Sequence, residues 1–75
     1  MPKIEFLKTN DLAELFGRHP ITIRNWVKAG LLPEPTPSPN DARENAYDAA
    51  TVLAMAIENG LKMDSLLETV IRENI

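Results

Sequence analysis

The apolar positions and turn residues of this 75-residue chain divide it into four helical stretches. The first covers about residues 10–16, and the second begins at Pro20 and ends near Gly30. The third covers about residues 48–59 and the fourth about residues 63–74. Spacings of three and four residues put apolar side chains on one face of a helix. The pattern therefore predicts a mainly α fold in which about four helices share one core.

Cap and turn residues indicate where these helices begin and end. Thr9 is predicted to cap the first helix, and Gly17 can take the left-handed conformation that stops it. His19 stands directly before Pro20, which suits a capping residue followed by proline in the first helical position. Asp48 is predicted to cap the third helix in the same way. Residues 9–30 thus read as helix, turn, helix, the motif that places its second helix in the DNA major groove.

Prolines occupy every second position from Pro33 to Pro39, which excludes a helix and favours extended backbone. Residues 31–47 are therefore predicted to form a loop or the wing edge of a winged helix-turn-helix, and this stretch with its flanks is predicted to be a small two-stranded hairpin. The whole chain, residues 1–75, is predicted to be one domain, since its length allows a single small core.

The second helix is predicted to have one buried and one exposed side. The side that faces the first helix holds three apolar residues and a glycine: Ile23, Trp26, Val27 and Gly30. The opposite side and the turn before it hold the candidate DNA-binding residues: Arg18, His19, Ile21, Thr22, Arg24, Asn25 and Lys28. Basic and amide side chains on an exposed helix face are typical of a DNA recognition helix.

Each candidate has a specific interpretation and a plain one. Arg24 can pair with guanine or clamp a phosphate, and otherwise it is a surface arginine paired with an acid. Asn25 can read adenine, or it is an ordinary exposed residue. Ile21 can touch a thymine methyl group, or it packs against the loop. Three further side chains suit phosphate contacts better than base contacts: Arg18, Thr22 and Lys28. For His19, we expect a helix cap or a phosphate contact.

Charge modifies this picture. The net charge is −3, but residues 1–32 carry five basic and three acidic residues, a balance of +2, whereas residues 33–75 carry three and eight, a balance of −5. Phosphate affinity depends on Lys and Arg, so we expect useful DNA affinity only from two or more copies. The fourth helix has an apolar stripe that either closes the core or extends into a homodimer contact: Met63, Leu66, Leu67, Val70 and Ile71.

Several classes of function are not expected. The chain has no cysteine, one histidine and no glycine-rich phosphate loop, which argues against an enzyme, a metal site and a cofactor. It also has no apolar run close to the roughly 20 residues that span a bilayer and no signal-peptide core. We therefore expect a cytoplasmic protein with no membrane partner.

The order of elements and five short motifs resemble the MerR-type winged-helix domain. The motifs lie at residues 12–17, 22–26, 29–33, 47–48 and 60–63, and the resemblance extends over about residues 6–71. Excisionases and the small terminase subunits of lambda-like phages share this domain, and this chain resembles them too. The resemblance implies a transcription regulator or an excisionase-type recombination factor, encoded by a phage or mobile element and acting on double-stranded DNA in a bacterial host cell.

The chain also departs from that family. A basic residue usually stands close before the wing tyrosine, whereas here Arg43 stands four positions before Tyr47, between Asp41 and Glu44. The resemblance implies that the hairpin around Arg43 lies along a minor groove or the DNA backbone. Two alternative functions stay open: the DNA-recognition domain of a terminase small subunit, and a protein-interaction module that has kept the fold without binding DNA.

Overall fold

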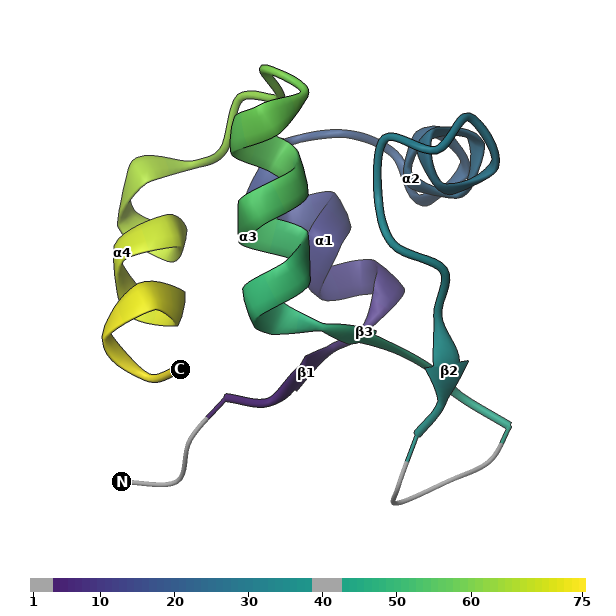
Figure 1. The fold of residues 1–75 in the computed structure, drawn as a ribbon, viewed down its shortest axis with the longest axis horizontal. Coiled ribbons are helices and arrows are strands. Elements are labelled where there is room, and N and C mark those ends of the chain that lie inside the picture. The colour runs from purple at the N-terminus through teal and green to yellow at the C-terminus, as the bar shows by residue number, and fades with distance from the viewer. Residues whose placement is uncertain (1–3, 39–42) are drawn as a thin grey trace.

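Four helices and three short strands make up the protein in a computed structural model that describes residues 4–38 and 43–75. In chain order the elements are β1 (Phe6–Leu7), α1 (Thr9–Phe16), α2 (Pro20–Lys28), β2 (Thr36–Pro37), β3 (Asn45–Asp48), α3 (Ala49–Glu58) and α4 (Ser65–Glu73). In Figure 1, α3 lies in front of α1, with α4 on one side and α2 on the other. The strands lie below the helices, and the β2–β3 hairpin is on the same side of the molecule as α2. The prediction of four helices is confirmed.

Most of the predicted helix ends are confirmed in detail. Gly17 ends α1 with a φ of 62°, and the Nδ1 atom of His19 accepts a hydrogen bond of 3.2 Å from the Ile21 N–H at the start of α2. The prediction that Thr9 caps α1 is wrong, because Thr9 is the first helical residue and its hydroxyl donates to the Tyr47 hydroxyl at 3.5 Å. Instead, the Asp11 carboxylate accepts a hydrogen bond of 2.9 Å from the backbone N–H of Lys8, which satisfies a donor at this helix end.

The sheet has three antiparallel strands in the order β1-β3-β2, and not only the two strands of the predicted hairpin. The hairpin is present, with Thr36 opposite Ala46. The added strand is β1, in which Leu7 pairs with Tyr47 of β3. Two residues are too short for an alternating pattern, so only pairing with a distant segment reveals this strand. Asp41, which the sequence places near Arg43, lies outside the described residues.

One apolar core joins the helices to β3. The buried side chains are Leu7, Leu12, Leu15, Phe16, Ile23, Leu32, Tyr47, Ala49, Val52, Leu53, Ala56 and Ile71. Trp26 and Val27 are half-buried and pack against this core, and the Trp26 ring meets Phe16 edge to face with centroids 5.5 Å apart. Gly30 was predicted on the buried side, but it is exposed and ends the α2 region with a φ of 82°.

The fourth helix begins two residues later than predicted and divides its apolar stripe. Asp64 caps α4 by accepting the Leu67 N–H at 3.0 Å, so Met63 belongs to the preceding loop. Ile71 is buried, and Met63 and Leu67 pack partly against the core. Leu66 and Val70 are left 72% and 43% exposed. The stripe therefore contributes to the core and also leaves an apolar strip on the surface.

The cap of α3 leads to a stability prediction. The Asp48 carboxylate accepts hydrogen bonds from the Thr51 hydroxyl at 2.6 Å and the Thr51 N–H at 2.9 Å, and these bonds lower the pKa of Asp48 below its ordinary value of 3.8. We expect Asp48→Ala to lower the free energy of unfolding by about 1 kcal/mol at neutral pH. Because the folded-state pKa is lowered, this contribution is present above the ordinary pKa and is lost as the pH falls through the folded value.

Urea unfolding at pH values from neutral to strongly acidic measures this effect. Glu58→Ala, which removes an exposed acid at the other end of α3, is the matched control and should show no such loss. An equal loss in both variants, or a loss at Asp48 that does not change with pH, contradicts the assignment.

Candidate nucleic-acid interface

Helix α2 buries one side and exposes the side that carries the candidate residues. Ile23 is fully buried, and this anchors α2 against α1. The predicted exposed positions are exposed in the structure: Arg18, His19, Ile21, Arg24, Asn25 and Lys28. Thr22 is half-buried. Ile21 is 58% exposed, so its packing against the loop is not the arrangement seen.

An open polar groove of about 300 Å³ brings residues from three parts of the chain together. Its lining consists of Lys8, Thr9, Asn10, Arg24, Arg43, Glu44 and Asn45. Arg24 comes from α2 and Arg43 from the segment just before β3, so the groove joins the predicted helix and hairpin residues. Three cationic side chains at one groove favour a polyanionic ligand.

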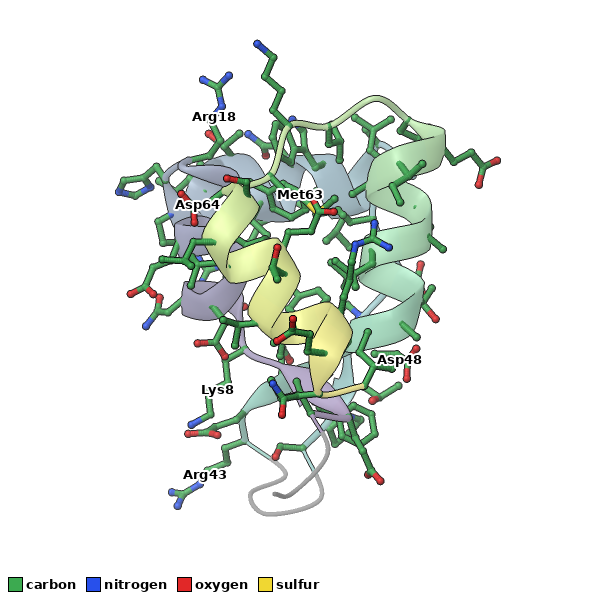
Figure 2. All side chains as sticks on the ribbon, turned by 90° about the vertical axis from the view of Figure 1, so that its left-hand side faces the viewer. Lys8, Arg18, Arg43, Asp48, Met63 and Asp64 are labelled. Atoms are coloured by element: carbon green, nitrogen blue, oxygen red, sulfur yellow. The ribbon has the colours of Figure 1, made fainter. Side chains whose placement is uncertain are left out.

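Lys8 is a groove residue that the sequence reasoning missed. Its position depends on the pairing of Leu7 with Tyr47, which puts the end of β1 beside the hairpin. Figure 2 shows Lys8 and Arg43 projecting from the same lower edge of the molecule. The Lys8 Nζ atom lies 3.3 Å from a carboxylate oxygen of Glu44, and the two side chains are 65% and 44% exposed. No local sequence signal indicates this neighbourhood, because residues 8 and 44 meet only through the sheet.

A second basic site lies at the other end of α1. Arg18 and Lys62 line a shallow pocket with the rings of Phe16 and Trp26. Figure 2 shows Arg18 at the upper end of the molecule, far from Arg43 in that view. Lys62 comes from the loop between α3 and α4 and was also missed by the sequence reasoning. Arg18 is 44 positions away in the chain, so the sequence offers no direct sign that the two residues line one pocket.

The basic residues are unevenly placed over the described surface. Apart from Arg72, the basic residues within residues 4–38 and 43–75 lie on α2, in the turn before it, at the groove or in the α3–α4 loop. Arg72 lies on α4, where its Nε donates to Glu68 at 2.7 Å. The basic side chains therefore gather around α2, the groove and the α3–α4 loop, and two of them, Lys8 and Arg72, pair with a glutamate.

The described part of the chain contains neither a cluster of metal ligands nor a helix that could span a membrane. No group of three histidine, aspartate or glutamate side chains there could hold a metal ion. Among the same residues, no helix has the length and apolar character needed to cross a membrane. His19, the one histidine, has its Nδ1 atom engaged in the cap of α2.

Comparisons of the chain with protein-family models, curated proteins and solved structures found no significant match. The residues of the α2 surface and of the groove beside it are therefore the features that bear on function.

Proposed function

We propose that this chain is a sequence-specific DNA-binding protein in which α1, α2 and the β2–β3 hairpin act as a winged helix-turn-helix. One observation carries the proposal: Arg24 on the exposed side of α2 and Arg43 beside the hairpin line the same groove. A protein that contacts DNA with a helix and a wing needs cationic groups from both elements on one surface. The resemblance to the MerR-type domain supports the same assignment.

In this proposal α2 enters the major groove. With its side chains an α-helix is about 10 to 12 Å across, which suits a major groove about 12 Å wide, and α2 has nine residues to lay along it. Arg24 and Asn25 are then the residues that read base edges. The DNA phosphates are contacted by Arg18, Thr22 and Lys28. The hairpin around Arg43 follows an adjacent minor groove or the backbone. The biological role is that of a transcription regulator or an excisionase-type recombination factor.

Amide NMR spectra of the isotope-labelled chain test which surface meets DNA. On addition of a short duplex, we expect the largest chemical-shift changes in α2, at Lys8 and in residues 43–45. Changes confined to α3 and α4 would place the ligand on the opposite surface and contradict the proposed interface. No shift changes at any residue would favour the alternative of a protein-interaction module.

The proposal includes self-association on DNA through α4. The basic side chains of a chain with net charge −3 give few phosphate contacts, so two copies on a repeated or palindromic site are needed for tight binding. Leu66 is 72% exposed and Val70 lies one turn further along α4 with 43% exposure. Burial of these side chains between copies provides the contact.

We expect Leu66→Ser to weaken the binding of a second copy at least about tenfold, because a buried leucine contributes roughly 1.5 to 3 kcal/mol. Analytical ultracentrifugation on duplexes with one and two sites measures this effect. Ile57→Ser removes a side chain of similar exposure, 59%, from α3 and serves as the control. If the unmodified chain binds tightly as one copy, or if both variants behave alike, α4 is not the contact.

A further inference from the structure

The polar groove contains an acid as well as three cations. Glu44 is the hairpin residue directly before β3. Its carboxylate oxygen lies 3.3 Å from the Nζ atom of Lys8, which stands at the start of α1. Arg24 and Arg43 line the same groove. A carboxylate and a phosphate both accept hydrogen bonds from the same cationic donors. The free protein thus has an anion of its own at the place where the basic side chains converge.

We propose that Glu44 occupies the position of a DNA backbone phosphate in the free protein, and that binding exchanges the carboxylate for a phosphate on Lys8. This inference rests on the proposed function and assigns two residues, Lys8 and Glu44, that the sequence does not single out. Glu44 is then a competitor that reduces affinity for every duplex. Since Lys8 contacts a DNA phosphate and not a base, Glu44 changes the affinity for DNA without changing the base preference.

The energies are compatible with such an exchange. The Lys8 and Glu44 side chains are 65% and 44% exposed, so water screens their attraction and the pair contributes little to stability. DNA offers a dense row of phosphates, and its bound counterions are released when a lysine replaces them. The pair is therefore weak enough to open when DNA approaches. Glu44 nevertheless lies close enough to Lys8 to compete with a weakly bound phosphate for its ammonium group.

The substitution Glu44→Gln removes the competing charge and keeps the shape of the side chain. The backbone carbonyl of Glu44 accepts the Ser38 N–H at 2.9 Å, a bond that the substitution leaves in place. At about 0.1 M ionic strength we expect Glu44→Gln to bind a random duplex about two- to fivefold more tightly. Glu58→Gln, with the same change of net charge on the distant end of α3, should leave the affinity unchanged.

The two residues are then tested together by a double-mutant cycle. In a Lys8→Gln background, Glu44→Gln should give no gain, because the cation that it releases is absent. Fluorescence anisotropy with a random duplex and with a duplex from the DNA flanking the gene measures all four proteins. The gain should be the same factor for both duplexes.

Each outcome decides between the proposals. DNA binding with no gain in Glu44→Gln overturns this inference and leaves the proposed function standing. A gain that persists in the Lys8→Gln background overturns it as well, because it indicates a general charge effect. If only Glu44→Gln binds and the unmodified chain does not, the competitor role of Glu44 is supported directly. The absence of binding by every variant overturns the inference together with the proposed function.

Discussion

Arg24→Gln is expected to weaken binding to a cognate duplex by about five- to 150-fold, which corresponds to roughly 1 to 3 kcal/mol. Arg24 lies on the exposed side of α2 and lines the groove that also holds Arg43. A guanidinium can form two parallel hydrogen bonds with a guanine edge, whereas a glutamine amide cannot reproduce that pattern or its charge. The loss should therefore be greater for the cognate duplex than for a random one.

The matched control is Arg72→Gln, which makes the same change on α4. Arg72 is paired with Glu68 at 2.7 Å and belongs to a different surface, so we expect little change in DNA affinity. Anisotropy titrations of both variants against both duplexes give the comparison. Equal losses in the two variants indicate that only net charge matters, and equal losses on the two duplexes limit Arg24 to a phosphate contact.

Leu12→Ala is expected to lower the free energy of unfolding by about 2 to 5 kcal/mol. Leu12 has no exposed surface and belongs to the core formed by α1, α2, β3 and α3. A chain of this size has a total stability of only roughly 4 to 11 kcal/mol, so the loss removes a large part of it. Urea unfolding followed by the fluorescence of Trp26, the one tryptophan, measures the change.

Leu66→Ala supplies the control because it makes the same chemical change at a side chain that is 72% exposed. Its stability should stay within about 0.5 kcal/mol of the unmodified chain. A small effect at Leu12 and a large effect at Leu66 would mean that α1 is not packed as described.

The helices could be predicted from the sequence because their end signals are local. Gly17, His19 with Pro20, and Asp48 each act within four residues, and all three signals function as predicted. The prediction for Thr9 was wrong because Asp11 satisfies the helix start and the Thr9 hydroxyl meets Tyr47 instead. A local rule cannot register a partner that is 38 positions away.

The candidate site could be predicted only in part for the same reason. Helical periodicity was enough to place Arg24 and Lys28 on an exposed side of α2. The groove needs the third strand, since the pairing of Leu7 with Tyr47 carries Lys8 to the hairpin. Strand β1 has only two residues and no alternation of its own. The Lys8–Glu44 pair therefore emerges only from the assembled sheet.

The apolar spacing of α4 does not indicate which of its residues are buried in the core and which stay exposed. The sequence predicts five apolar residues on one side of the fourth helix and leaves their role open between core and partner contact. The structure divides them, with Ile71 buried and Leu66 exposed. Helix α4 follows the loop that joins it to α3. The Asp64 N–H donates to the Leu15 carbonyl at 2.6 Å and fixes that loop against α1.

The most direct test of sequence-specific DNA binding is fluorescence anisotropy of the purified chain with two duplexes over a salt series. One duplex has a random sequence, and the other comes from the DNA that flanks the gene. The account predicts saturable binding that favours the flanking DNA and weakens steadily as salt is added. No binding to either duplex at low salt would contradict it, and Arg24 and Lys28 would then be ordinary surface charges on a protein-docking domain.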